Sequence, residues 1–365
     1  MPGDKLRVGI IGANVKRGWG ASAHIPALKA LPEFELAAVC TAHQETAEES
    51  AQAFGARLAF HDYHAMVTHP DIDIVTVAVR VPFHHELTTA ALQAGKHVYT
   101  EWPLGATLAE AQDLANLARA KGVQTMVGLQ GRASPTYQYL KELVDGGYVG
   151  RVMTVNLTAF TASGVDRTSD RVWAAGRAAG VGTFTIAFGH AIDALTFALG
   201  DLTEVAGVVS TQLPTWHITD LNKDIEATAP DTALLNGRLT GGAVVSAHMA
   251  SVPWHGTGLT LRVFGTDGTL VCTGPQTTRG KLQGAKGTDA ALQDMPVPAA
   301  HNWVPGDTPD GAPYNVAQMY RRFGEAIRTG SAAEPGFDHA VKLHKLLSAL
   351  ETSSSEGVRV DPRTV

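Results

Sequence analysis

The first 130 residues alternate short apolar runs with segments of helical periodicity, and this alternation constrains the fold more than any other feature. The run at 72–79 is rich in β-branched residues, as in strands that are buried on both faces of a sheet. Strands joined by helices of this length form βαβ units in a parallel, doubly wound sheet. We therefore predict a Rossmann domain over residues 1–130. Its strands are expected at 6–11, 34–41, 72–79, a run ending at 100, and 123–129.

A glycine-rich turn, residues 9–20, follows the first apolar run and opens a helix. Glycines such as Gly12 and Gly18 let the backbone approach a pyrophosphate, and the helix start stabilises its charge. Asn14 occupies the usual place of the second glycine, and asparagine tolerates left-handed backbone geometry better than most residues. A tight turn without a ligand is the alternative, but the βαβ context favours a dinucleotide site.

The end of the second strand bears on the choice of cofactor. An NAD site usually offers an acidic residue about twenty residues after the glycines. Here the strand ends at Thr41, His43 follows, and no acid precedes Glu45. A 2′-phosphate would meet no repulsion, and Thr41, His43 or Arg17 could bind it. The prediction is NAD or NADP, with NADP slightly favoured and NAD, held by hydroxyl and backbone contacts, left open.

The pattern of expected helices and strands changes after Gly131. A helix is expected over 134–146, and helical periodicity returns at 314–329 and 338–353. The segment 274–311, rich in Gly, Pro, Thr and Asp, is expected to be a long excursion. We predict that residues 131–365 form a second α/β domain with a large, mainly antiparallel sheet. Its strands are expected at 151–160, 204–209, 231–239, 243–250, 258–264 and 269–273.

Composition narrows the class of protein. The net charge of −6 argues against nucleic acid or an anionic membrane as the main partner. Two distant cysteines imply no disulfide framework, and the first strand begins too early for a signal peptide, so we expect a cytoplasmic protein. The closest histidine clusters, His61 with His64 and His84 with His85, lack a second ligand pair, so no metal site is predicted.

Several short motifs occur in a family-specific order. They are His24-Ile25-Pro26-Ala27, Pro82-Phe83-His84-His85, Gly95-Lys96-His97-Val98, Gly128 to Arg132, Gly189-His190-Ala191-Ile192-Asp193 and Phe264-Gly265-Thr266-Asp267-Gly268. Through them the chain resembles the glucose–fructose oxidoreductase and inositol dehydrogenase family (Gfo/Idh/MocA) over almost its whole length. The Gly18-Trp19-Gly20 loop and Phe188-Gly189-His190 are similar to the branch that contains the fungal galactose-regulon repressor.

The resemblance implies a nicotinamide cofactor between a Rossmann domain and a substrate domain. The second domain's open sheet implies a homo-dimer or homo-tetramer. Glu101 fits the role of holding the nicotinamide ribose. The candidate cofactor-binding residues are Gly12, Asn14, Gly18, Trp19, Thr41, His43, Val79, Arg80, His84, Glu101 and Gln130.

The family's usual catalytic groups are only partly retained. Trp102 stands where the resemblance implies a lysine that assists deprotonation of the substrate hydroxyl, and an indole N–H exchanges no proton. Alignment on His190 and Asp193 places Ile186 at the family's first active-site aspartate. His190 remains the candidate acid or base, because imidazole titrates near neutrality. Its alternative is a histidine that only binds substrate or caps the fold.

Other candidates have two interpretations each. Tyr137 is a possible proton donor or a core residue, and Arg132 a substrate contact or an ion-pair partner. Trp173 is a sugar platform or a core tryptophan. Trp102 could stack on a sugar or nicotinamide face, and Asp193 could orient His190 or face solvent.

These observations predict an NAD(P)-dependent oxidoreductase that transfers hydride between nicotinamide and a sugar, polyol or related small cyclic substrate. Two alternatives stay open: a non-catalytic protein that senses a dinucleotide or a sugar, and an NAD-dependent glycosidase on the same fold.

Overall fold

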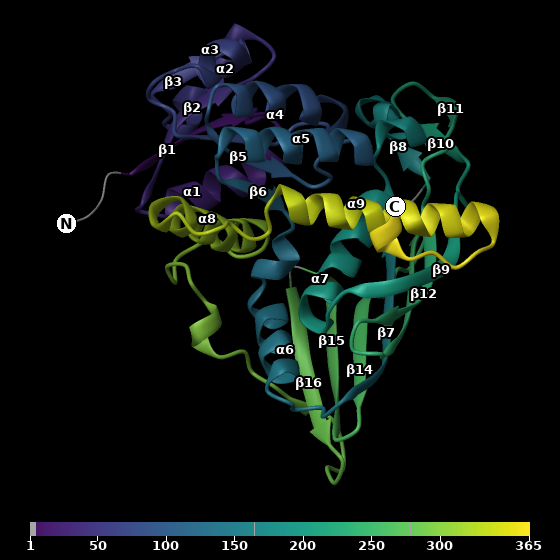
Figure 1. Cartoon of the computed structure of the whole chain (residues 1–365). Coiled ribbons are helices and arrows are strands. Elements are labelled where there is room, and N and C mark those ends of the chain that lie inside the picture. Colours follow the sequence, from purple (N-terminus) through teal and green to yellow (C-terminus); the bar gives the residue numbers. More distant parts are fainter. Residues whose placement is uncertain (1–4, 164, 278) are drawn as a thin grey trace. The chain divides into compact units, whose positions relative to one another are not determined.

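The computed structural model describes residues 5–163, 165–277 and 279–365. The chain divides into two compact units (Figure 1). The first unit contains Met1–Ala133 and Asn302–Val341, and the second contains Ser134–His301 and Lys342–Val365.

The first unit is built on a six-stranded parallel sheet in the order β3-β2-β1-β4-β5-β6. Every residue of β4 is buried, as its apolar sequence predicts for a central parallel strand. The predicted doubly wound fold is confirmed. The strands are β1 (Leu6–Ile11), β2 (Phe34–Cys40), β3 (Leu58–Phe60), β4 (Ile74–Val77), β5 (His97–Glu101) and β6 (Thr125–Gly128).

Local signals set the ends of the helices in this unit. Thr107 caps α5 by accepting a hydrogen bond from the Glu110 N–H, and Gly122 ends the helix in the left-handed conformation. The α-helices here are α1 (Ile25–Ala30), α2 (Gln44–Phe54), α3 (Tyr63–Val67), α4 (His84–Gln93), α5 (Leu108–Lys121) and α8 (Ala312–Thr329).

Helix α8 was expected in the second domain, together with everything after residue 130, but it belongs to the first unit. Its apolar face carries Tyr320 and Phe323, both fully buried in the core formed with β1 and α1. Periodicity shows that a helix has an apolar face but not which sheet that face covers, so the sequence could not assign α8.

The second unit contains an eight-stranded sheet in the order β17-β16-β15-β14-β7-β13-β12-β9. All neighbours are antiparallel except β7 and β13. This confirms the predicted mainly antiparallel sheet. Its strands are β7 (Val152–Ala162), β9 (Leu202–Ser210), β12 (Thr232–Leu239), β13 (Val244–Val252), β14 (Gly258–Gly265), β15 (Gly268–Gln276), β16 (Arg279–Lys286) and β17 (Gln293–Asp294).

Two parts of this unit differ from expectation. Strands β16 and β17 lie within 274–311, which was expected to be an excursion. The glycines and polar residues of β16 obscure the alternation that indicates a strand, and β17 has only two residues, both polar. A small sheet of β8 (Asp166–Arg167), β10 (Thr215–Ile218) and β11 (Lys223–Glu226) was not foreseen. The α-helices are α6 (Pro135–Asp145), α7 (Gly189–Leu199) and α9 (Phe337–Glu356), which crosses the division between the units.

Strand alternation gives the large sheet two different faces. Leu157, Ala247 and Cys272 lie on the face that is buried beneath α6 and the turn before α7. Residues 177–199, which include α7, are long and apolar enough by length and composition to cross a membrane, and 56% of the apolar window is buried inside the structure. Core helices of soluble proteins give the same measure.

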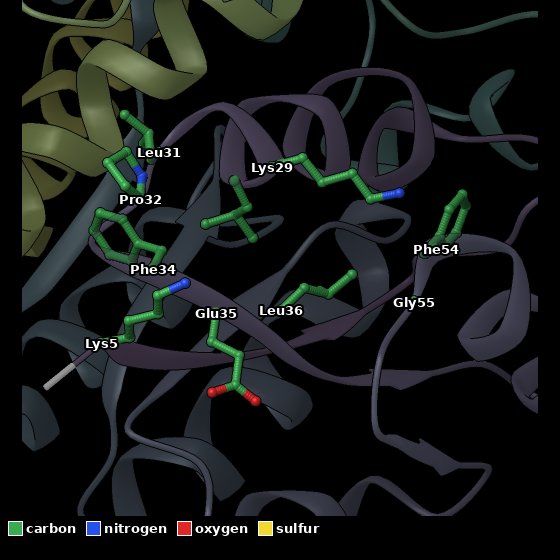
Figure 2. Close-up of a pocket in the computed structure, with 10 residues that line it drawn as sticks. Lys5, Lys29, Leu31, Pro32, Phe34, Glu35, Leu36, Phe54 and Gly55 are labelled. Carbon is green, nitrogen blue, oxygen red and sulfur yellow. The ribbon is translucent and has the colours of Figure 1, made fainter.

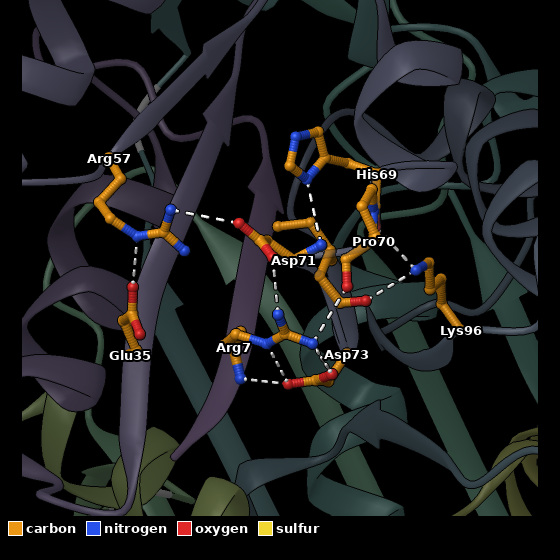
Figure 3. Close-up of polar contacts among 9 residues, drawn as sticks. Arg7, Glu35, Arg57, His69, Pro70, Asp71, Asp73 and Lys96 are labelled. Carbon is orange, nitrogen blue, oxygen red and sulfur yellow. Dashed lines mark hydrogen bonds and ion pairs between the residues drawn. The ribbon is translucent and has the colours of Figure 1, made fainter. Parts of the chain in front are cut away.

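A network of charges joins the N-terminal ends of β1 and β4 (Figure 3). The Arg7 side chain donates to both carboxylate oxygens of Asp73, at 2.8 and 3.0 Å, and to Asp71 at 2.9 Å. Burial alone would raise the pKa of Asp73, but the hydrogen bonds and the charge of Arg7 outweigh it, so the pKa is lowered. The network fixes the edge of the sheet opposite the glycine turn.

We expect Asp73→Asn to lower the free energy of unfolding at pH 7 by about 1–2 kcal/mol, because the pair is charged but only partly buried. A carboxyl whose pKa is lower in the folded state contributes stability above its unfolded pKa of about 3.9, and loses it as pH falls through the folded value. Urea unfolding at pH 7 and pH 3 should show the deficit shrinking at the lower pH. Glu35→Gln, which breaks the more exposed pair with Arg57 and leaves the hydrogen bonds between Arg7 and Asp73 in place, is the control. An equal deficit at both pH values would contradict this assignment.

Candidate active site

The turns after β1 and β4 meet where the strand order reverses. Gly12 has φ +100°, and a Cβ atom there would lie 2.3 Å from the backbone oxygen of Ala78. Only glycine allows this approach. In an open parallel sheet, ligands bind at this edge, outside the carboxyl ends of the strands that flank the reversal.

The segment after Gly12 leaves helix donors available to a phosphate. The π-helical turn Gly20–His24 begins after Trp19 with no side-chain cap, and of its first residues Ser22 already donates its N–H to the Gly18 carbonyl oxygen at 3.1 Å. Gly18 has φ +104°, and a Cβ atom there would find no other atom nearer than 3.7 Å. An uncapped helix start beside an open glycine turn fits a pyrophosphate.

Asn14 acts differently from our expectation. Among the described residues, only glycines, Asn222 and His255 have positive φ, so Asn14 does not use the left-handed conformation. Its side-chain oxygen instead accepts from the Lys16 N–H at 2.9 Å, which closes a local turn. The longer loop also rests on α2, where the Val15 N–H donates to the Ser50 hydroxyl.

The ribose end carries the predicted residues, but one is already engaged. The buried Thr41 hydroxyl contacts the Thr46 hydroxyl at 2.7 Å and donates to the His43 carbonyl oxygen at 3.1 Å. Thr41 therefore shapes the start of α2. His43 and Arg17 are exposed at the same edge. They are the groups left for a 2′-phosphate, and no carboxylate precedes Glu45.

The ends of β5 and β6 hold Glu101 in a fixed position. Its carboxylate accepts from the side-chain amide of Gln130 at 2.9 and 3.1 Å and from His24 Nε2 at 2.9 Å. His24 was not among the predicted site residues, although it begins the His-Ile-Pro-Ala motif. The signal that could have found it was a histidine inside an otherwise apolar segment.

His84 lies behind the site and not at its surface. Its Nδ1 is 2.7 Å from the Pro103 carbonyl oxygen, and its Nε2 is 3.1 Å from the Val79 carbonyl oxygen. Burial lowers the pKa of His84, although the two carbonyl oxygens favour its charged form. This arrangement suits a brace between the loops after β4 and β5 better than a direct cofactor contact.

The remaining candidates of the first unit lie at the same edge of the sheet. Trp102 is only 4% exposed, which leaves little ring surface for stacking. Arg80 is exposed beside the half-buried Val79, and Arg132 is half-buried in the turn after β6. The positive charge of Arg132 contributes to a lowered pKa of Arg322, after burial as the main cause.

In the second unit, His190 lies in the first turn of α7 and is half-buried. Asp193, one turn on, is 1% exposed, so the alternative in which it faces solvent is wrong. Ile186, four residues before His190, is 36% exposed and lies in a π-helical turn. An apolar side chain therefore stands exposed next to the candidate acid or base.

Two other candidates of this unit have different surroundings. Tyr137 is buried on α6, and burial together with the neighbouring Cys272 raises its pKa well above the usual value. This favours its core interpretation over that of a proton donor. Trp173 is half-buried in the turn Ser169–Ala174.

A separate hollow of about 290 Å³ lies at the opposite edge of the first sheet (Figure 2). Leu28, Pro32, Phe34 and Phe54 line it, at the start of β2 and the end of α2. The charged residues Lys5, Lys29 and Glu35 line it as well, and it lies far along the strands from the glycine turn. It has no part in the dinucleotide site.

Comparison with known proteins places this geometry in a family. Residues 6–129 match the family described as "Oxidoreductase family, NAD-binding Rossmann fold". Residues 135–274 match the family of the Gal80p C-terminal domain. A dehydrogenase of Aspergillus oryzae, aclE, is 32% identical over 260 residues, which cover 68% of this chain and 71% of the relative. The chain belongs to the NAD-binding Rossmann oxidoreductase family.

Other relatives include enzymes and a regulator. Levoglucosan dehydrogenase of Pseudarthrobacter phenanthrenivorans is 26% identical, and the match covers 98% of both chains. A levoglucosan dehydrogenase structure in complex with NADH and levoglucosan is 25% identical, has a TM-score of 0.86, and aligns with 98% of this chain and 99% of its own. The galactose/lactose metabolism regulatory protein GAL80 of Saccharomyces cerevisiae is 28% identical over 66% of this chain and 59% of its own.

Gly128→Ala should displace the carboxylate of Glu101, because a Cβ atom at residue 128 would lie 2.4 Å from Oε2. We expect NADH to bind about tenfold more weakly or worse, as for the loss of a hydrogen bond to a charged group. Calorimetric titration with NADH measures the change, and circular dichroism checks the fold. Gly241→Ala is the matched control, since its added methyl group meets open space. Equal NADH affinity in both variants would contradict the proposed packing.

Proposed function

We propose that this protein is an NAD(P)-dependent oxidoreductase that transfers hydride between nicotinamide and a sugar, polyol or related small cyclic substrate. The main support is the dinucleotide edge of the first unit, where the Gly12 turn, an uncapped helix start and a fixed Glu101 carboxylate occur together. Similarity over nearly the whole chain to levoglucosan dehydrogenase supports a carbohydrate-like substrate.

Different residues at this edge bind different parts of the cofactor. Gly12 and Gly18 give backbone access to the pyrophosphate, and Glu101 accepts hydrogen bonds from the nicotinamide ribose. His43 and Arg17 are the groups we propose for a 2′-phosphate, so both NAD and NADP should be assayed. When bound, the nicotinamide supplies the hydride acceptor or donor.

We propose His190 as the group that exchanges the proton of the substrate hydroxyl. Its imidazole is half-buried, and imidazole titrates near neutral pH. With Trp102 at the position of the family lysine and Ile186 at that of the aspartate, no other group at these positions can carry a proton. The buried Asp193, three residues on, is placed on the same helix face to orient the imidazole.

A sensor without turnover is the second candidate, and a specific observation favours it. The two replaced groups, together with the match of residues 135–274 to the Gal80p C-terminal domain, are what a binding protein derived from an enzyme would show. Such a protein would keep Glu101 and the glycine turn, since both serve binding alone.

Turnover by the wild-type protein with NAD⁺ or NADP⁺ should appear as rising absorbance of the reduced cofactor on a panel of sugars, polyols and glycosides. His190→Ala should lower kcat about 100-fold or more, because it removes a general acid or base. His217→Ala, in the small sheet, is the control.

NADH binding should stay within about threefold in both variants. Tight NADH binding without turnover on any substrate would contradict the enzyme and support the sensor. Glycoside cleavage without net cofactor reduction would support a glycosidase.

We further propose a cytoplasmic homo-dimer or homo-tetramer that binds no nucleic acid or membrane. The outer face of the large sheet carries Val208, Leu234, His248 and Thr158 in one row, and Val208 is half-exposed. Light scattering coupled to size exclusion should give two or four times the mass of 38.4 kDa. Val208→Lys should shift the protein toward the monomer. A monomeric wild-type protein would contradict this proposal.

A further inference from the structure

A chain of buried side chains runs from helix α8 to Glu101. The Thr76 hydroxyl lies 2.8 Å from the Tyr320 hydroxyl, and the Tyr320 hydroxyl lies 2.9 Å from His24 Nδ1. His24 Nε2 then lies 2.9 Å from the Glu101 carboxylate. Thr76, Tyr320 and His24 are completely buried, so none of these polar groups exchanges partners with water.

The partners fix where the proton of His24 lies. An ionised carboxylate only accepts hydrogen bonds, so Nε2 must carry a proton whether the imidazole is neutral or charged. When it is neutral, Nδ1 is an acceptor and the Tyr320 hydroxyl donates to it. Tyr320 therefore stabilises the tautomer that donates to Glu101 and opposes the one that would leave Glu101 without this donor.

The rings around His24 restrict its orientation as well. Its ring meets those of Tyr99 and Tyr320 edge to face, with centroids 5.2 and 5.6 Å apart. On the other side of Glu101, Gln130 donates to both carboxylate oxygens. The carboxylate is thus held from two directions. Its remaining lone pairs are the ones that can accept from a ligand.

We propose that His24 and Tyr320 are positioning residues, which hold the Glu101 carboxylate in one orientation as the acceptor for the hydroxyls of the cofactor's nicotinamide-side ribose. The inference rests on the proposed function for the identity of the ligand. It adds a role for α8, which lies far from the glycine turn in sequence and contributes the Tyr320 hydroxyl to the same site. A mobile carboxylate would lose side-chain entropy when the ribose binds. A carboxylate that is already held in place avoids this cost, so the ligand binds more tightly.

The test compares ligands that contain or lack this ribose. NADH and ADP-ribose contain it, and ADP does not. In calorimetric titrations of the full chain, His24→Leu should weaken NADH and ADP-ribose about tenfold, the size expected for losing a hydrogen bond to a charged group, and leave ADP unchanged. His24→Gln places an amide N–H where Nε2 was and should restore most of the affinity. Tyr320→Phe keeps the ring and should have an intermediate effect.

Phe323→Leu is the matched control, because Phe323 is equally buried on α8 but is not a member of the chain. It should lower Tm but leave the ratio of the affinities for ADP-ribose and ADP unchanged. In the apo protein, ¹⁵N NMR of the imidazole should show His24 protonated on Nε2 in the wild type. In Tyr320→Phe the Nδ1 resonance should shift, because the hydroxyl that donates to that nitrogen is gone.

Each outcome of the titrations supports or overturns the inference. If His24→Leu weakens ADP as much as ADP-ribose, or weakens neither, or if the wild type binds none of the three ligands, the inference is wrong. A wild type that binds NADH without turning over any substrate would refute the enzymatic function alone, and the ribose-selective loss would still support the positioning role.

Discussion

The approach of the β1 turn to the β4 turn is the constraint on which the rest of the first unit depends. A side chain at Gly12 would collide with the backbone of Ala78, so the two turns meet only because this position has no Cβ atom. With the turns in contact, the carboxyl ends of β1, β4, β5 and β6 form one continuous edge. Glu101, Gln130 and the uncapped helix start can then act on one ligand.

The sequence predicted this edge well because its signals are local. A glycine turn after an apolar strand, and strands alternating with helices, leave few other arrangements. The role of α8 was not predictable in the same way. Its apolar stripe around Tyr320 is equally compatible with either sheet, and the polar contact from Tyr320 to His24 joins residues nearly 300 positions apart. Strand β16 was missed because glycine and lysine dilute its alternation of apolar and polar residues.

Burial separated the site candidates in a way that residue type alone could not. Tyrosine, histidine and tryptophan serve equally as core residues and as ligand contacts. Tyr137 and His84 proved buried against a thiol and two carbonyl oxygens, and Thr41 satisfies its hydroxyl within its own turn. Arg17, His43 and His190 keep accessible surface. Fewer residues are accessible to a ligand than the sequence predicted as site residues.

Under the proposed alignment, Trp102 and Ile186 replace a lysine and an aspartate, and the two replacements have a common physical consequence. Each puts an apolar group where a charge would stand, Trp102 in the first unit and Ile186 in the second, and an apolar group does not stabilise an ionised intermediate. A single imidazole can neutralise such a charge only while it is itself protonated. Catalysis would therefore depend on one titrating group where the family commonly uses three. A binding protein would lose nothing by the same replacements, because the acceptor at Glu101 is built from the first unit alone.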